Sequence, residues 1–352
     1  MFEVRYGGAP ARCSRLLAAA VVVAASAPAF AGTSILFIGN SFTYGALTPA
    51  VQNYKVNTVV DLNWASGTVS NGVGTQIGGV PALFKQMTVD AGLSYDVSLA
   101  TFPGSNLDTH YNNAARRALI DKSWDKVAMH GQSNLDFAAP NNPAKISQFT
   151  GLLGTMFQAK NAAVDVSLSA TWSRADLTIA SGANTCATNP AASPWCGAPI
   201  TQMGIDVQAG YDVAKTNNPT IVSRVNPVGL AWNNAFNAGF ADANPYDGIA
   251  PGTVNLWASD SYHASAYGYY LHALTVFGQA TGLSPTVLGF DTAAQDLGFT
   301  SQQAVAMQGF AAAAIAAVPE PSQWLMLAIG GGLLAWRVQR RQRALAGRAT
   351  SP

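Results

Sequence analysis

The sequence is poor in charged residues, and glutamate is nearly missing from it. Charged residues make up 11% of the 352 residues, and the only glutamates, Glu3 and Glu320, lie near the two ends. Residues 32–317 carry 16 aspartates against 11 lysines and arginines, a net charge of −5. A mildly acidic body lacks the basic surface that nucleic acids require, which argues against nucleic-acid binding. This composition also excludes a glutamate as general acid or base in that part of the chain.

The first apolar run, residues 16–25, follows Arg12 and Arg15 and precedes the small residues of Ala29-Phe30-Ala31. This layout is typical of a secretory signal peptide that is cleaved after Ala31. A buried N-terminal helix is disfavoured because a predicted strand begins directly afterwards. We therefore expect signal peptidase to remove residues 1–31 and the protein to be exported.

Cysteine is also scarce. The chain has three cysteines, and Cys13 leaves with the predicted signal peptide. The other two, Cys186 and Cys196, lie in a segment rich in proline, alanine and asparagine. Because exported proteins meet an oxidising environment, we predict a disulfide between Cys186 and Cys196 that closes this loop.

The C-terminal end combines three features in order: Pro319-Glu320-Pro321, a mostly apolar run over residues 324–336, and an arginine cluster over residues 337–343. The apolar run is shorter than the ~20 residues of a full membrane span, and the arginines favour the cytoplasmic side. This end resembles a PEP-CTERM sorting signal, with an ordinary C-terminal anchor helix as the alternative. The resemblance implies a Gram-negative bacterium that exports exopolysaccharide, transient membrane insertion, and processing by an exosortase.

Between the two ends, short apolar runs alternate with longer amphipathic stretches, which is the pattern of βα repeats around a parallel sheet. The predicted strands are residues 35–38, 58–62, 97–101, 126–129, 164–170 and 220–225. The predicted helices are residues 81–91, 113–122, 143–160, 202–216 and 264–278. We expect one domain over residues 32–282, a linker or C-terminal extension over 283–317, the sorting signal over 318–343 and a tail over 344–352.

Residues 33–45, TSILFIGNSFTYG, hold an apolar run that ends in Gly39-Asn40-Ser41. Such a run, closed by glycine and small polar residues, predicts a buried parallel strand that leads into a tight turn. Open α/β folds bind their ligands at the carboxyl ends of the strands, so Ser41 is a candidate nucleophile. The alternative is that Asn40 and Ser41 merely cap the following helix.

A second informative stretch holds Asp260 and His263 at the predicted start of a helix. A serine nucleophile needs a base such as histidine, and that base needs an acidic group to orient it. No third ligand follows at zinc-like spacing, so neither a metal nor a cofactor is predicted. We interpret His272, further along the same helix, as a histidine of the helix face.

Together these stretches resemble the SGNH, or GDSL-type, hydrolase family. Its nucleophile lies in a Gly-Asp/Asn-Ser motif after the first strand, like Gly39-Asn40-Ser41, and its acid and base lie in a late Asp-x-x-His motif, like Asp260 and His263. The resemblance covers residues 34–282. It implies a three-layer α/β/α sandwich around a mostly parallel, flavodoxin-like sheet of five or six strands. It also implies a serine esterase with Ser41 as nucleophile, His263 as base and Asp260 as orienting acid.

The same resemblance implies an oxyanion hole. Its backbone donors would be the N–H groups of Ser41 and of Gly104, which follows a predicted strand. The family's Gly-x-Asn block is irregular here, because Gly131 and Asn134 are one residue too far apart. Either Asn134 or Gln132 would supply the third donor.

Several alternatives stay open. Residues 131–134 also resemble the nucleophile motif of sialate O-acetylesterases, which makes Ser133 a second candidate, although Ser41 is better placed at the first strand. His110 could face the site, but a place on a surface loop is the simpler expectation. Four tyrosines near the base either line a sugar site or pack on a helix face: Tyr262, Tyr267, Tyr269 and Tyr270.

We expect a secreted esterase that removes acetyl or other acyl groups from carbohydrate or exopolysaccharide, because export and the sorting signal accompany the esterase motifs. Its expected location is the cell envelope or extracellular matrix. A short-chain or lipid ester is an alternative substrate. The rival function is that of a non-catalytic matrix or carbohydrate-binding protein on the same fold, which the irregular block at residues 131–134 favours.

Overall fold

The computed structural model describes residues 1–3, 7 and 32–318. The predicted signal peptide, the predicted sorting signal with its apolar run, and the tail fall outside these residues, apart from a few isolated positions. Within the described part of the chain, no helix is long and apolar enough to cross a membrane.

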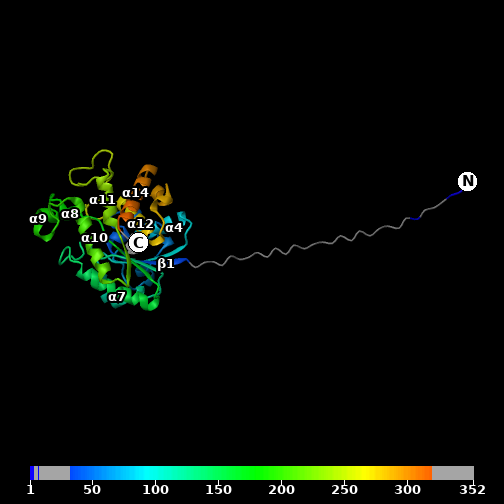
Figure 1. Cartoon of the computed structure of the whole chain (residues 1–352), viewed down its shortest axis with the longest axis horizontal. Coiled ribbons are helices and arrows are strands. Elements are labelled where there is room, and N and C mark those ends of the chain that lie inside the picture. Colours follow the sequence, from blue (N-terminus) through cyan, green and yellow to red (C-terminus); the bar gives the residue numbers. More distant parts are fainter. Residues whose placement is uncertain (4–6, 8–31, 319–352) are drawn as a thin grey trace, which may run out of the picture. The chain divides into compact units, whose positions relative to one another are not determined.

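A six-stranded parallel sheet forms the centre of the domain (Figure 1). Its strands are β1 (Thr33–Gly39), β2 (Val60–Asp61), β3 (Tyr95–Thr101), β4 (Lys126–Met129), β5 (Asp165–Ser169) and β6 (Val222–Asn226). They lie in the order β2-β3-β1-β4-β5-β6, and all neighbouring pairs are parallel. The strand order reverses at β1, and in open α/β sheets such a switch point opens a crevice at the carboxyl ends of the strands.

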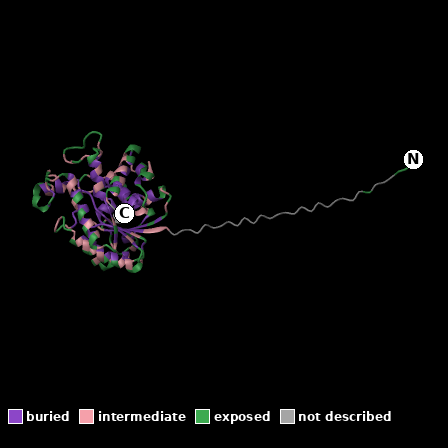
Figure 2. Ribbon diagram, viewed as in Figure 1, coloured by how far each residue is buried: buried purple, intermediate pink, exposed green. Residues whose placement is uncertain are grey.

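Apolar side chains of β1 serve two cores, one on each face of the sheet. Ile35 and Phe37 belong to one core, and Leu36 and Ile38 belong to the other, because successive side chains of a strand point to opposite faces. Buried residues accordingly fill the strands and the helix faces turned toward them (Figure 2). A continuous apolar run is what a strand covered on both faces requires.

Helices cover both faces of this sheet. On the face of Ile35 lie α4 (Gly79–Asp90), α11 (Val228–Asn237), α12 (Ala266–Thr281) and α14 (Ser301–Ala317). On the face of Leu36 lie α6 (Ala114–Ile120), α7 (Ala144–Lys160) and α10 (Ile200–Asn217). Figure 1 shows α11, α12 and α14 gathered on one side and α7 on the other. The prediction of a three-layer α/β/α sandwich is confirmed.

A linker was one of the two expectations for residues 283–317, but residues 285–317 are largely helical. They form η3 (Pro285–Leu288), α13 (Thr292–Asp296) and α14, a 17-residue helix opened by a capping box between Thr300 and Gln303. Met307, Ala311 and Ala314 of α14 are buried in the core beside α11 and α12. This part is therefore an extension that completes the helical layer. Alanine on all sides of α14 left no apolar periodicity in the sequence from which to predict it.

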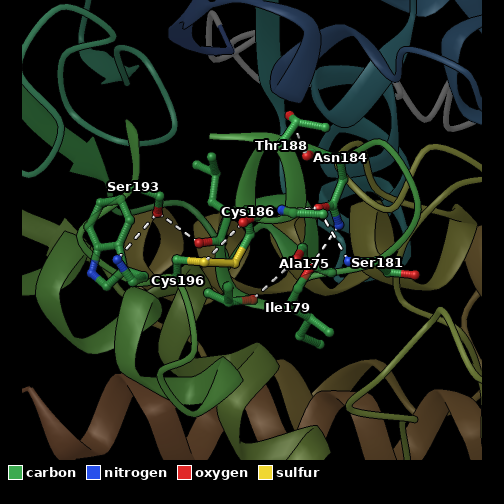
Figure 3. Close-up of a disulfide and its surroundings, with 12 residues drawn as sticks. Ala175, Ile179, Ser181, Asn184, Cys186, Thr188, Ser193 and Cys196 are labelled. Atoms are coloured by element: carbon green, nitrogen blue, oxygen red, sulfur yellow. Dashed lines mark hydrogen bonds between the residues drawn. A yellow bond between two sulfur atoms is a disulfide. The ribbon is translucent and has the colours of Figure 1, made fainter. Parts of the chain in front are cut away.

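An excursion between β5 and α10 carries the two remaining cysteines. It contains α8 (Ala175–Thr178), α9 (Thr185–Thr188) and η2 (Pro190–Ala192). A disulfide joins Cys186 to Cys196 with their Cα atoms 5.3 Å apart (Figure 3). The Ser193 hydroxyl donates to the Leu177 carbonyl at 2.7 Å, so the loop is fastened to α8 as well as closed on itself.

Candidate active site

The side chain of Asn40 connects the loops that leave three neighbouring strands. Its Nδ2 donates to the carbonyl oxygens of Ser105, after β3, and Gly131, after β4, both at 2.9 Å. Its Oδ1 accepts the Phe42 N–H at 3.0 Å and so caps α1 (Ser41–Tyr44). Asn40 is 4% exposed, so these bonds are shielded from water. Asn40 does cap the helix, as one expectation held, but Ser41 is the first helical residue and does not cap it.

Gly39 lets the chain turn at the end of β1. A Cβ atom on Gly39 would lie 2.2 Å from Thr43 Oγ1 and 2.5 Å from His130 Nε2. Those separations are far below van der Waals contact, so no larger residue fits without moving α1 or the loop after β4. Ser41 consequently begins α1 at the switch point of the sheet, buried to 5% exposure.

Asp260 and His263 form a hydrogen-bonded pair. His263 Nδ1 lies 2.6 Å from Asp260 Oδ2, and the backbone N–H groups of Tyr262 and His263 donate to Asp260 Oδ1. Burial alone would raise the pKa of Asp260, but these hydrogen bonds outweigh it and hold the pKa below its ordinary value. Asp260 is therefore ionised at neutral pH and keeps the proton of the imidazole on Nδ1.

The His263 ring lies beside the start of α1. Its centroid is 5.6 Å from that of Phe42, the residue after Ser41, and the two rings meet edge to face. No hydrogen bond joins Ser41 Oγ to His263 in the described part of the chain. Bonds of this kind are often long until substrate binds. The contact with Phe42 places the His263 ring close to the turn that carries Ser41.

Aromatic and cationic groups also pack beside His263, and Tyr262 contacts both His263 and Phe42. The Tyr262 ring lies 4.2 Å from the His263 ring, and the Arg174 guanidinium lies 3.6 Å over the Tyr262 ring. Arg174 in turn makes a two-pronged ion pair with Asp176 at 2.6 and 3.0 Å. This stack restricts the rotation of the His263 side chain.

The other tyrosines of the predicted cluster do not line a site. Tyr269 and Tyr270 of α12 are fully buried, and Tyr267 stacks on Phe299. Tyr269 supports the backbone of Ser41 from within the core, because its hydroxyl donates to the Ser41 carbonyl at 3.1 Å. Helix packing explains the cluster, and Tyr262 is the member that borders the candidate site.

The loop after β4 carries two amide side chains, Gln132 and Asn134, that differ in their hydrogen bonds. Gln132 is committed at both ends: its Nε2 donates to the Gly104 carbonyl at 3.1 Å, and its Oε1 accepts the Phe137 N–H at 2.9 Å. The side chain of Asn134 is buried, yet its Oδ1 has no partner among the described residues. Gly104 has φ = 64°, a left-handed conformation that suits glycine. The Asn134 Nδ2, which is the group that could donate to an oxyanion, makes no hydrogen bond among the described residues, whereas Gln132 Nε2 is already used.

A cavity of about 370 Å³ opens beside Asn134 and Tyr262. Its remaining lining residues are Phe137, Pro140, Arg174, Leu177, Thr185 and Ala192. Thr185 and Ala192 belong to the excursion that the disulfide closes. Ser133, the second candidate nucleophile, is buried and bonded to Arg174 Nη1 at 3.4 Å, and no histidine lies within hydrogen-bonding distance of its hydroxyl among the described residues.

Three further histidines, His110, His130 and His272, are buried around the end of β1. His110 Nε2 donates to the Gly39 carbonyl at 3.0 Å, so the expectation of a surface histidine was wrong. His130 Nδ1 donates to the Gly131 carbonyl and its Nε2 accepts from Thr43 Oγ1 at 2.6 Å. Burial lowers the pKa of His110 and His130 to about 4 and that of His272 to about 3. All three are uncharged at neutral pH and serve as supports.

Sequence reasoning selected Ser41, Asp260 and His263 as candidates from their motifs. It missed the bridging role of Asn40, the support from His130 and the stack of Arg174 on Tyr262. The position of Asn40 in the motif was a signal, whereas the other contacts join distant segments and leave no local pattern. Among the described residues, no group of three His, Cys, Asp or Glu side chains could hold a metal ion.

No protein-family model and no curated protein matches the chain. Similar solved structures include a protein assigned as a GDSL-like lipase from Parabacteroides merdae, at 14% identity and TM-score 0.44 over 72% of this chain and 96% of that one. A phospholipase A1 from Streptomyces albidoflavus gives 13% and 0.40 over 71% and 99%. A carbohydrate esterase family 2 enzyme from Corynascus thermopiles gives 13% and 0.36 over 71% and 67%. These scores carry no argument about function, which rests on the site.

The bridge made by Asn40 predicts a large loss of stability in Asn40→Ala. That variant removes the donor to the Ser105 carbonyl and leaves the Phe42 N–H without an acceptor, while the Gly131 carbonyl keeps the His130 Nδ1 donor. At about 1 kcal/mol or more for each of the first two groups, the free energy of unfolding should fall by about 2 kcal/mol or more in urea denaturation. The control Asn113→Ala removes an exposed helix cap and should cost about 1 kcal/mol. Equal losses in the two variants would contradict the bridging role.

The buried histidines predict that stability falls in mild acid. Their pKa values drop from 6.5 to about 4 or 3 on folding, so between these values the unfolded chain binds more protons than the folded protein. The free energy of unfolding therefore decreases as pH falls from 6.5 toward 4, by up to about 1.4 kcal/mol per pH unit for each histidine. In urea titrations at pH 7, 6 and 5, His272→Gln should show a shallower decrease. An unchanged slope would refute the assignment to His272.

Proposed function

We propose that the protein is a serine ester hydrolase in which Ser41 is the nucleophile, His263 the general base and Asp260 the group that orients the base. The 2.6 Å bond between Asp260 and His263 beside α1 carries the proposal. A histidine whose Nδ1 proton is held by an ionised carboxylate exposes Nε2 as a base. Ser41 lies at the first turn of a helix and at the switch point of a parallel sheet, and the next residue, Phe42, contacts the ring of that base. A serine in this position is suited to attack an acyl carbon.

The reaction would proceed in two halves. Ser41 Oγ attacks the ester carbonyl while His263 Nε2 takes its proton, and the imidazolium then gives that proton to the leaving alcohol as the acyl-enzyme forms. In the second half His263 removes a proton from water, which attacks the acyl carbon. The imidazolium then returns that proton to Ser41 Oγ as the acyl–Oγ bond breaks, which releases the carboxylic acid and restores Ser41 and His263. Asp260 remains ionised throughout, in keeping with its lowered pKa.

The oxyanion formed in each half needs donors that are not already used. The N–H groups of Ser41 and Gly104 have no protein acceptor among the described residues, and the Asn134 amide is the free side-chain amide of the loop after β4. We assign the third donor to Asn134, since the Gln132 amide is bonded at both ends. Each such donor is typically worth ~10²–10³ in rate.

We propose an acyl ester of carbohydrate, such as an acetylated polysaccharide, as the substrate. The support is the predicted export and sorting signal, and a site lined by amide, aromatic and small side chains. Among the described residues that line the cavity beside Asn134, Arg174 is the one charged residue, and its ion pair with Asp176 neutralises it. An uncharged group therefore fits there. Under this proposal the protein acts in the cell envelope or extracellular matrix, after processing by signal peptidase and an exosortase.

Hydrolysis of p-nitrophenyl acetate and butyrate by the protein, with Ser41→Ala alongside, tests the proposed activity. Turnover should be lost in Ser41→Ala without a change in the far-ultraviolet circular dichroism spectrum, because the hydroxyl makes no hydrogen bond that the fold needs. A Ser41→Ala variant with the wild-type rate would end the serine mechanism. Folded wild-type protein that cleaves neither these esters nor an acetylated xylan would favour the non-catalytic carbohydrate-binding alternative.

The choice of oxyanion donor yields a separate prediction. Asn134→Ala should lower kcat by ~10²–10³-fold with a small change in KM, because the amide acts mainly in the transition state. Gln132→Ala is the matched control in the same loop, and it should lower kcat by less than about tenfold, since it acts only through the position of Gly104. The opposite ranking of the two variants would move the donor to Gln132.

A further inference from the structure

A second cavity, of about 470 Å³, lies between α3 (Leu62–Ser66) and the glycine-rich loop that follows it. Its lining residues are Asn63, Trp64, Gly67, Thr68, Val69, Ser70, Asn71 and Gly74. The mechanism above uses none of them. The lining described here contains no charged side chain, so the cavity suits a neutral ligand.

The loop around this cavity is built on buried polar contacts. Asn71 is 3% exposed, and its Nδ2 donates to Asp61 Oδ2 at 2.9 Å and to the Thr75 carbonyl at 2.7 Å. Its Oδ1 accepts the N–H groups of Val73 and Gly74, both at 3.0 Å. These four bonds around one buried side chain hold the loop in a defined shape, so the cavity is preformed.

This loop also adjoins the loop that carries Gly104. A Cβ atom on Gly72 would lie 2.4 Å from Pro103 Cδ and 3.0 Å from Phe102 Cε2, so the Gly72 backbone packs directly against the side chains of Pro103 and Phe102. Arg116 adds a second link: its Nη2 donates to the Ser70 carbonyl at 2.8 Å, and its guanidinium lies 4.0 Å over the Phe102 ring. The cavity is thereby fixed next to a backbone donor of the proposed oxyanion hole.

Two groups in the lining are not used by the fold. Asn63 is 2% exposed, and its Oδ1 has no hydrogen-bond partner among the described residues. A buried carbonyl oxygen without a donor is destabilising, and a ligand hydroxyl that donates to it would offset that cost. Trp64 is 49% exposed, and an exposed indole offers a flat apolar face next to a polar N–H.

We propose that this cavity is a subsite for a neutral sugar residue of the substrate's alcohol part, with the ring stacked on Trp64 and a hydroxyl donating to Asn63 Oδ1. A sugar ring combines an apolar C–H face with hydroxyl donors, which matches this pair of groups. The inference rests on the proposed esterase function for its role in catalysis. The binding itself does not depend on that function, so the two can be tested apart.

Binding is measured first, by calorimetric titration of full-length Ser41→Ala with cellotriose, xylotriose, mannotriose and N-acetylchitotriose, and with trigalacturonic acid as an acidic comparison. At least one neutral trisaccharide should bind and trigalacturonic acid should bind more weakly. Adding Trp64→Ala should weaken the neutral sugar at least tenfold, and Trp64→Tyr, which keeps an aromatic face, should recover part of that loss. Phe290→Ala is the control, because it removes another exposed aromatic residue, 42% exposed, that does not line the cavity.

Kinetics on the otherwise wild-type protein then test the role in catalysis. Trp64→Ala should raise KM for an acetylated form of the bound sugar at least tenfold, with kcat little changed and p-nitrophenyl acetate hydrolysed as before. Failure of the esterase proposal would show as no hydrolysis of either ester while the titration still reports binding. The subsite is refuted if no neutral sugar binds, if Trp64→Ala binds like its parent, or if Phe290→Ala weakens binding equally.

Discussion

The candidate site depends on one buried amide, the side chain of Asn40. Loops after β1, β3 and β4 arrive at the same edge of the sheet with carbonyl and N–H groups that β pairing does not use. A buried backbone group without a partner is costly, and Asn40 satisfies three of them with both ends of its amide. The relative positions of Ser41, Gly104 and Asn134 follow from this arrangement, because each lies within a few residues of a group that Asn40 bonds.

Burial separates the histidines at this edge of the sheet into three that support the loops and one, His263, that is the candidate base. His110, His130 and His272 are enclosed and neutral, and the first two bond backbone or hydroxyl groups of the turn after β1 and its neighbouring loops. His263 keeps an open side and has a carboxylate partner. Two cavities border this edge, one beside Asn134 and one beside the Gly104 loop. Under the proposed esterase function, His263 is the one histidine of the four that is placed to act as a base.

Local sequence patterns were enough to predict most strands of the sheet and the helices between them, but not the C-terminal helix α14. The strand over residues 126–129 was predicted at its observed bounds. A short apolar run between polar segments is typical of a buried strand in an α/β chain. α14 was missed since alanine gives a helix no distinguishable faces. Residues 56–61 form a 3-10 turn and a two-residue strand in place of the predicted longer strand. The sequence could not decide between Asn134 and Gln132 as oxyanion donor. That decision depends on which amide is hydrogen-bonded to the loop of Gly104, which is distant in the sequence.

Because three of the four histidines are buried, the fourth, His263, can be modified or observed selectively. The chain has four histidines in all, and those at positions 110, 130 and 272 are at most 3% exposed, whereas the His263 side chain is 15% exposed. A water-borne reagent that acylates imidazole therefore meets a single accessible ring in the folded protein. The imidazole proton resonances of His110, His130 and His272 should likewise not respond to solvent pH near neutrality, because burial keeps their pKa values low. The protein can thus be followed at its own candidate base without an added label.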